Sequence, residues 1–343
     1  MSATSIQWTD RVWNPTRGCS RVSDGCANCY AINMAHRFSG KGQPYEGLTV
    51  IRRGKRDWAG FARFVPEMLS EPLTWKKPAR VFVNSMSDLF HPSLSNEEIA
   101  AVFGVMAACP QHTFQVLTKQ PERAAEWFEW AYHQRCHGNT TAEVMRDLAI
   151  GAGRFRRPDG SMPKGPGYAL LGFDDRWPLP NLWLGVSIEN QQTADDRLST
   201  LLTIPAAVRF ASYEPALGPV SLWAFLKTAL RDRSLYALKA PEMPGLDWVI
   251  CGGESGPGAR PCALEWLEAV LKQCREADVA CFVKQLGAYV VSEERACKTA
   301  EEAKRDFGAE SRWLWRAGLS SRKGDDMAEW PEALRVRQFP EGR

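Results

Sequence analysis

The 343-residue sequence contains no long apolar run, no internal repeat and no low-complexity tract. Its longest apolar stretch, Ile99 to Cys109, is far shorter than the roughly 20 residues needed to span a bilayer. That stretch is typical of a buried helix, and we expect no contact with a membrane. With 44% hydrophobic and 24% charged residues, the composition predicts a globular protein of one large α/β domain or two smaller ones.

The sequence also lacks a recognisable signal peptide, and its ten cysteines follow no regular spacing. Disulfide frameworks belong to secreted proteins, whereas thiols stay reduced in the cytosol. We therefore expect a cytoplasmic protein.

The net charge is only +3, so overall charge does not indicate a nucleic-acid partner. Two segments nevertheless mix basic with aromatic residues, a pattern that can follow a phosphate backbone and stack bases. Solvated loops whose aromatic side chains pack into the core explain this pattern equally well. The first group is Arg52, Arg53, Lys55, Arg56 and Arg63 with Trp58, Phe61 and Phe64; the second is Arg154, Arg156, Arg157 and Lys164 with Phe155.

Three cysteines near the N-terminus form the most informative motif of the chain. Cys19, Cys26 and Cys29 lie within residues 18–30, and the motif contains no fourth cysteine or histidine. Thiolates bind iron–sulfur clusters, and three of them would leave one iron of a [4Fe–4S] cluster open to a substrate or cofactor. The spacing therefore favours a catalytic iron–sulfur cluster site.

Two alternative interpretations of this loop stay open. A structural zinc ion normally has four protein ligands, so a zinc site would need His36 or a later cysteine as the fourth. Purely structural cysteines would have to gather within eleven residues by chance.

Short apolar segments alternate with helical ones after this loop, which is typical of a parallel sheet with crossover helices. We predict an α/β fold, a partial or full parallel (β/α) barrel, with an open doubly wound sheet as the alternative. A cap at Ser95 or Asn96 is expected to begin the first of the helices. The expected strands are 80–84, 113–117, 182–186, 207–211, 246–251 and 280–284, and the expected helices are 96–109, 121–130 and 264–277.

The barrel is expected to span residues 1–291, with an inserted loop region at about 131–180 and a shorter insertion at 227–244. Both segments interrupt the alternation of strands and helices. Residues 292–343 are expected to form a C-terminal extension packed on the barrel.

Nearly every expected strand is followed by a carboxylate, a cation or a glycine. In a parallel barrel these positions share one face, where active sites are built. The pattern therefore predicts a site, although any single residue, such as Glu189, is as readily a helix cap or surface group. The glycine-rich run 252–258 has neither phosphate-loop nor dinucleotide spacing, and contact with a cofactor or a structural turn would explain it.

The cysteine loop and the expected barrel together resemble the radical S-adenosylmethionine superfamily. The chain is most similar to a phage- and mobile-element-associated branch with a three-cysteine motif and unknown substrate. The superfamily's common loop has a first gap of three residues and an aromatic before the last cysteine; here the gap is six, Asn28 takes that place, and Tyr30 follows. The segments that carry the resemblance are 13–19, 25–30, 117–123, 252–256, 282–287 and 325–332.

This resemblance implies a barrel of the radical S-adenosylmethionine type with two cofactors, a [4Fe–4S] cluster and S-adenosylmethionine. Cys19, Cys26 and Cys29 would hold the cluster, and electron transfer would yield a 5′-deoxyadenosyl radical. The candidates for cofactor binding are Ser85, Asp88, Glu189, Glu214, Gly252, Gly253 and Glu254. The catalytic candidates are the cations Lys119 and Lys284 and the proton carrier His91, with Arg123 and Arg260 as further cations.

Three functions fit this sequence. The first is a radical enzyme that modifies or repairs nucleic acid or a nucleotide, supported by the basic and aromatic segments and the phage association. The second is a non-catalytic iron–sulfur or zinc protein that binds DNA or a partner protein. The third is a radical enzyme that modifies a peptide or protein, for which a co-encoded partner is expected. Either enzyme would need an electron-donor protein.

Overall fold

The computed structural model describes residues 4–134, 140–153, 176–226, 244–292, 315–316, 318–321 and 323–340. The chain divides into two compact units, Met1–Val186 with Thr203–Val208 and Ser187–Leu202 with Arg209–Arg343. The second basic and aromatic group, at 154–164, and nearly all of the 227–244 insertion lie outside the described residues. None of the described helices has both the length and the apolar character that crossing a membrane requires.

The main sheet has seven strands in the order β1-β6-β7-β8-β9-β10-β12, and its strands pair in parallel. Its terminal strands, β1 and β12, do not pair with each other in the described part of the chain, so the sheet is open. The α/β prediction with a parallel sheet is confirmed.

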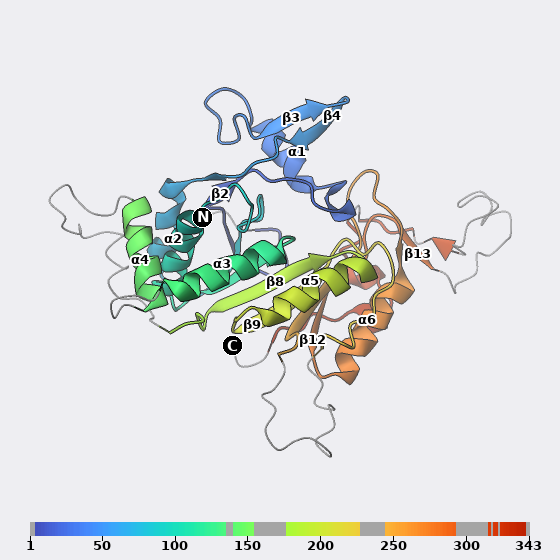
Figure 1. Ribbon diagram of the computed structural model, residues 1–343. Helices are drawn as coiled ribbons and strands as arrows, with labels where there is room; N and C mark the ends of the chain where they lie inside the picture. Colours follow the sequence, from blue (N-terminus) through green and yellow to red (C-terminus); the bar gives the residue numbers. More distant parts are fainter. Residues whose placement is uncertain are drawn as a thin grey trace, which may run out of the picture. The chain divides into compact units, whose positions relative to one another are not determined.

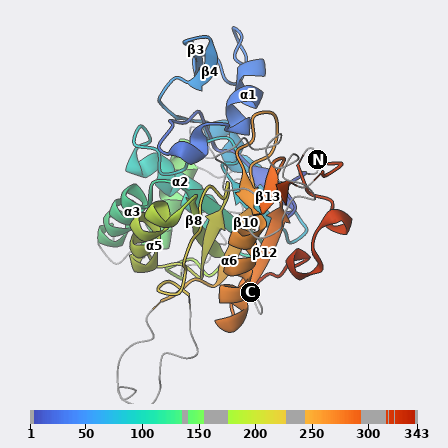
Figure 2. The same cartoon turned by 90° about the vertical axis from the view of Figure 1, so that its right-hand side faces the viewer.

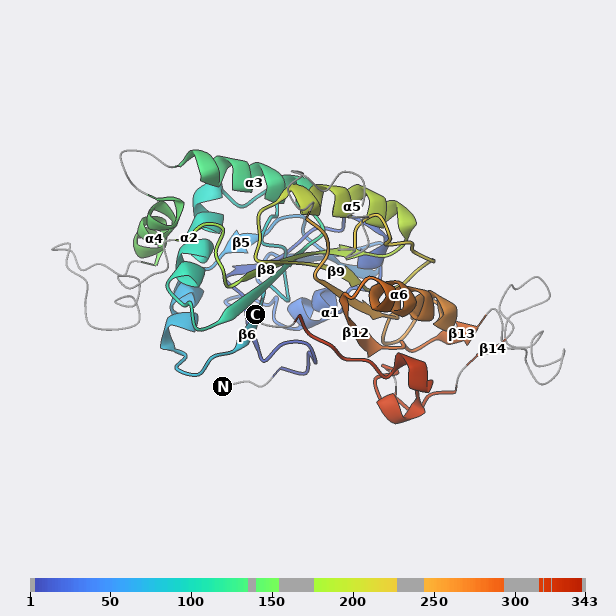
Figure 3. The same cartoon turned by 90° about the horizontal axis from the view of Figure 1, so that it is seen from below.

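The main-sheet strands in the first unit are β1 (Arg11–Trp13), β6 (Arg80–Val83), β7 (Thr113–Thr118) and most of β8 (Leu182–Ile188). Helix α2 (Asn96–Ala107) begins with a capping box between Ser95 and Glu98 and is buried from Ile99 to Ala107. Helices α3 (Pro121–His133) and α4 (Thr141–Ala152) complete this part, with α4 beside α2 in Figures 1 and 3.

Gly104 explains how closely α2 and α4 approach. A Cβ atom at this position would lie 2.2 Å from the carbonyl oxygen of Met145. Any larger residue would therefore push the two helices apart.

The N-terminal part of the first unit contains the cysteine loop and a small core of its own. Helix α1 (Tyr30–Arg37) packs against the hairpin of β3 (Thr49–Arg52) and β4 (Lys55–Trp58), as Figure 1 shows. A short ribbon joins β2 (Thr16–Arg17) to β5 (Arg63–Phe64). The first basic and aromatic group is thus largely a hairpin; Trp58 is buried, whereas Phe61 is 41% exposed. The short helices of this unit are η1 (Asp24–Cys26), η2 (Pro66–Ser70) and η3 (Pro72–Thr74).

The second unit contains β9 (Val208–Tyr213), β10 (Trp248–Gly252) and β12 (Ala280–Gln285), with α6 (Leu264–Glu276) packed against β10 and β12 (Figure 2). Near the C-terminus, Val336 accepts a hydrogen bond from Val283 of β12. The remaining elements of this unit are α5 (Gln191–Thr203), β11 (Cys262–Ala263), β13 (Val290–Ser292), β14 (Trp315–Arg316), η5 (Met327–Glu329) and η6 (Glu332–Leu334).

The nine expected strands and helices are all present, with ends shifted by a few residues. Ser95, and not Asn96, is the residue that caps α2. The sequence did not lead us to expect β1, α5 or the β3–β4 hairpin.

Candidate functional site

The three predicted cluster ligands lie on one loop of the first unit, between β2 and α1. Gly18 begins this loop with a φ of +90°, and a Cβ atom there would lie 2.5 Å from the carbonyl oxygen of Phe61. Arg21 closes the loop by donating hydrogen bonds to the carbonyl oxygens of Cys26 and Ala27. Its Nε atom also donates to Asp57 of β4, at 2.7 Å. Backbone geometry and one arginine therefore fix the loop to the hairpin.

The three thiols are free and lie within electrostatic range of one another. Burial is the main cause that raises the pKa of Cys19 and of Cys29, and neighbouring thiolates raise both further. The backbone N–H groups of Ala31 and Ile32, in the first turn of α1, act in the opposite direction and lower the pKa of Cys29. A bound metal would instead lower the pKa of these thiols, because coordination removes the proton from a thiol.

The three thiols of this loop are suitable donors for an iron–sulfur cluster, although their side chains are not arranged around one metal position. Within the described ranges, no group of three His, Cys, Asp or Glu side chains is arranged to hold a metal ion. Cys19 and Cys29 pack on the apolar side chains of the small core, which limits water around the sulfur atoms. His36, the alternative fourth ligand for zinc, has its Nδ1 atom 3.0 Å from Thr49 Oγ1 on the hairpin.

The segment that follows β6 lies against the cysteine loop. Asn84 has a φ of +62°, and its side chain accepts a hydrogen bond from the backbone of Thr16. Ser87 pairs with Gly18 in a parallel bridge. The hydroxyl of Tyr30, the residue after Cys29, donates to the carbonyl oxygen of Ser85 at 2.7 Å. Ser85, a predicted cofactor contact, therefore lies beside the loop.

Asp88 joins this segment to the end of β7. Its carboxylate accepts hydrogen bonds from the backbone of Phe90 and Lys119, at 3.0 and 2.9 Å, and from the hydroxyl of Thr118. Burial raises the pKa of Asp88 despite these hydrogen bonds. The charge of the same carboxylate also raises the pKa of Cys19, in addition to the larger effect of burial.

His91 links the cysteine loop to Ser93, in the segment between β6 and α2. Its Nδ1 atom accepts a hydrogen bond from the backbone N–H of Ser93, so the ring proton is on Nε2. Nε2 lies 2.8 Å from Ser20 Oγ, next to Cys19. Burial lowers the pKa of His91, which keeps the ring neutral. This histidine therefore positions the loop in the folded protein.

The backbone of Lys119 is hydrogen-bonded to Asp88, and the charge of its side chain lowers the pKa of Cys29. Arg123, on α3, instead donates to Asn96 at the start of α2, at 2.6 Å. The first unit therefore brings together seven predicted site residues, namely Cys19, Cys26, Cys29, Ser85, Asp88, His91 and Lys119.

In the second unit, each predicted carboxylate is paired with a cation. Glu189, 1% exposed, lies 3.1 Å from Arg197 of α5, which also donates to the carbonyl oxygen of Ser187. Lys284 Nζ lies 2.6 and 2.8 Å from the two carboxylate oxygens of Glu214. These contacts tie the ends of β8, β9 and β12 to neighbouring elements.

Of the three carboxylates, Glu254 accepts the most hydrogen bonds from its cationic partner. Arg260 donates to it from its backbone N–H and from Nε and Nη2, at 2.9, 3.0 and 2.6 Å. Planar guanidinium and carboxylate groups match in this bidentate arrangement.

Gly252 and Gly253 allow a close approach between β10 and the end of β12. Cβ atoms at these positions would lie 2.8 and 2.2 Å from the carbonyl oxygens of Gln285 and Leu286. Tight packing is therefore sufficient to explain both glycines, whatever else they contact.

A profile of the family described as "Protein of unknown function (DUF5131)" matches residues 3–313. The chain belongs to the DUF5131 family. Comparisons with curated proteins and with solved structures found no match. All candidate site residues of this DUF5131 chain lie within the matched range.

Sequence reasoning missed an exposed apolar stripe on α1 and its C-terminal cap residue, here called the α1 stripe. Tyr30, Met34 and Phe38 are 56%, 42% and 47% exposed and recur every fourth residue. That spacing places them on one helix face, and it could have been recognised from the sequence. Two cations flank the α1 stripe: Arg37 lies 4.0 Å from the sulfur of Met34, and Arg56 donates to Asn33 at 3.2 Å.

Proposed function

We propose that this DUF5131 protein holds a [4Fe–4S] cluster and uses S-adenosylmethionine for radical chemistry on nucleic acid or a nucleotide. The observation that carries the proposal is the set of seven predicted residues gathered around one loop of three thiols. The fold is compatible with it, because a parallel α/β sheet is the scaffold that the resemblance implies. A radical S-adenosylmethionine barrel in the cytoplasm, with an electron-donor protein as partner, is part of the same proposal.

Cys19, Cys26 and Cys29 would hold the cluster, which supplies an electron and an open coordination position for S-adenosylmethionine. The protein's own residues shape the loop and adjust its charge. Gly18 and Arg21 fix the backbone, and Lys119 offsets part of the negative charge of three thiolates. Apolar packing beneath the loop excludes water.

Of the three predicted carboxylates in the second unit, Glu214 is the most accessible. Its side chain is 18% exposed, whereas those of Glu189 and Glu254 are 1% and 7% exposed, and its partner Lys284 is 23% exposed. A partly exposed pair can exchange its internal partner for a ligand at lower cost than a buried one. Glu214 and Lys284 are therefore the second-unit residues that we favour for cofactor or substrate contact.

The α1 stripe supports a nucleic-acid substrate. Exposed aromatic side chains stack on bases without sequence preference, and neighbouring cations contact the phosphates. Tyr30 and Phe38 supply the rings, and Arg37 and Arg56 supply the charge. Because Tyr30 directly follows Cys29, a strand stacked on α1 would reach the cysteine loop.

Anaerobic purification with iron and sulfide analysis, followed by a dithionite-reduced assay for 5′-deoxyadenosine, tests the proposal. We expect about four irons and four sulfides per chain and cleavage of S-adenosylmethionine. Zinc in place of iron, with no cleavage, would overturn the enzyme proposal and leave a non-catalytic metal protein that binds nucleic acid or a partner. Cleavage that is stimulated by a co-purifying polypeptide and not by nucleic acid would point to a peptide substrate.

A further inference from the structure

A pocket in the first unit is lined by two arginines from opposed positions of a short ribbon. Strands β2 and β5 are antiparallel, and Arg17 stands directly opposite Arg63. Like charges in directly opposed positions destabilise a β-ribbon. An anion bound in the pocket would weaken that repulsion.

Most of the hydrogen-bonding capacity of these arginines is unused. The Arg17 side chain forms no hydrogen bond with any residue that the structure describes. It lies 5.9 Å from the ring centroid of Tyr45, and its charge opposes the rise that burial causes in the pKa of Glu71. Arg63 donates once, to the carbonyl oxygen of Pro44 at 3.2 Å. A guanidinium group carries five N–H donors, so both side chains can still bind a multidentate acceptor.

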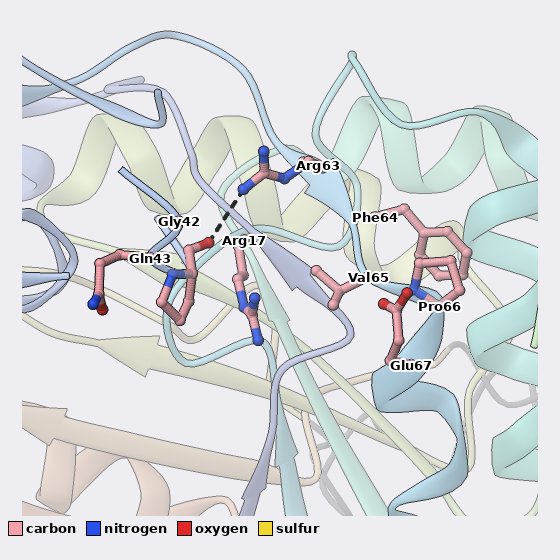
Figure 4. A pocket seen from close by; sticks show the side chains of 9 residues that line it. Arg17, Gly42, Gln43, Arg63, Phe64, Val65, Pro66 and Glu67 are labelled. Carbon is pink, nitrogen blue, oxygen red and sulfur yellow. Dashed lines mark hydrogen bonds between the residues drawn. The ribbon is translucent and has the colours of Figure 1, made fainter. Parts of the chain in front are cut away.

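The pocket has a volume of about 490 Å³, within the range of small-molecule sites. Figure 4 shows the Arg17 side chain among the lining residues, with Arg63 hydrogen-bonded beside it. Phe64, Val65 and Pro66 supply apolar surface, and Glu67 contributes the one carboxylate of the lining.

We infer that this pocket binds a phosphate ester, with Arg17 and Arg63 donating to the phosphate oxygens. Arginine suits this ligand because its planar donors match phosphate geometry. The inference rests on the proposed function for the remainder of the ligand, a nucleotide or a nucleic-acid strand. S-adenosylmethionine has no phosphate, so the pocket serves the substrate and not the cofactor. Arg17 precedes Cys19 by two residues, so the phosphate site adjoins the cysteine loop.

The test measures binding of a 5′-phosphorylated single-stranded oligonucleotide, of adenosine monophosphate and of inorganic phosphate to the full chain. We expect the double variant Arg17→Gln, Arg63→Gln to bind the oligonucleotide about tenfold more weakly. The salt dependence of binding should also fall, by about 0.7 in log–log slope for each phosphate that the variant no longer neutralises. Arg275→Gln, which removes one charge from the end of α6, is the control. Comparing the three ligands identifies whether a mononucleotide or a strand is preferred.

A second measurement needs no variant. Dicarbonyl reagents label exposed arginines, and phosphate should protect Arg17 and Arg63 in the wild-type chain while leaving Arg275 reactive. Unchanged affinity of the double variant, or equal labelling with and without phosphate, would overturn the inference. Iron content and deoxyadenosine formation are measured on the same samples. If the wild-type chain contains no iron and forms no deoxyadenosine, the proposed function is refuted, whereas the evidence for the phosphate site is unchanged.

Discussion

The cysteine loop of the first unit and the carboxylate–cation pairs of the second unit contain the two sets of residues that the sequence singled out. The carboxylates are internally satisfied: Glu189, Glu214 and Glu254 each meet a cation. The loop carries three free thiols, and exposed apolar side chains of α1 and the opposed Arg17 and Arg63 adjoin it in the chain or the fold. The comparison teaches that polar residues at strand ends can be explained by folding alone, whereas the structure gives the three thiols and the two opposed arginines no comparable internal ion pair among the residues that it describes.

The largest expected effect follows from the loop. Cys26→Ala should abolish the brown colour, all iron binding and all cleavage of S-adenosylmethionine, because three thiolates share one cluster. Iron analysis after anaerobic purification checks this.

Cys109→Ala is the matched control, since Cys109 is a buried thiol at the end of α2. It should keep its iron and lose about 1 kcal/mol of stability. A Cys26→Ala protein with full iron content would refute the cluster assignment.

The buried ion pair of the second unit should give the next largest effect. Arg197→Met leaves Glu189 buried without its cation and should cost about 3 kcal/mol in the free energy of unfolding. Denaturant unfolding of this variant and of the double variant Glu189→Gln, Arg197→Met measures the interaction free energy between the two side chains. If the double variant recovers none of the loss, the pair does not act as a unit, and a ligand-binding role for Glu189 gains support.

A smaller effect is expected on the α1 stripe. Phe38→Ala should weaken single-stranded nucleic-acid binding by about 1–2 kcal/mol, because one stacking surface is lost, and should leave the iron content unchanged. Fluorescence anisotropy with labelled strands measures the affinity. Trp223→Ala removes an aromatic of similar exposure from the second unit and serves as the control. Equal affinities for both variants and the wild type would separate the stripe from nucleic-acid binding.

Glu254→Gln should have the smallest effect on stability. It tests most directly whether a carboxylate that is paired inside the protein also contacts a ligand. The amide keeps one acceptor for Arg260, so we expect a loss of about 1 kcal/mol in stability. If the pair is only structural, calorimetry will show unchanged affinity for S-adenosylmethionine. A weaker affinity with the iron content intact would place Glu254 in the cofactor site and would show that internal pairing does not exclude ligand contact.

The sequence predicted those parts of the fold whose signals are local. The strand at 182–186 is a continuous apolar run and proved to be buried at every position. Helix α2 was identified by its apolar stretch and by a capping residue, Ser95 or Asn96, at its start. Helix α5 was missed because its sequence is mostly polar and only four of its residues are buried, including Arg197. The β3–β4 hairpin was missed because Trp58 is its one buried residue.

For the candidate site, the sequence by itself determined the cysteine spacing, the glycine that starts the loop and the residue types at the strand ends. Only the tertiary structure decided their partners. Glu214 and Lys284 are 70 residues apart in the chain, and Arg17 and Arg63 oppose each other through the register of two short strands. Caps, turns and apolar periodicity act over a few residues, so they can be read from the sequence. Ion pairs and cross-strand contacts depend on which distant segments the fold makes neighbours.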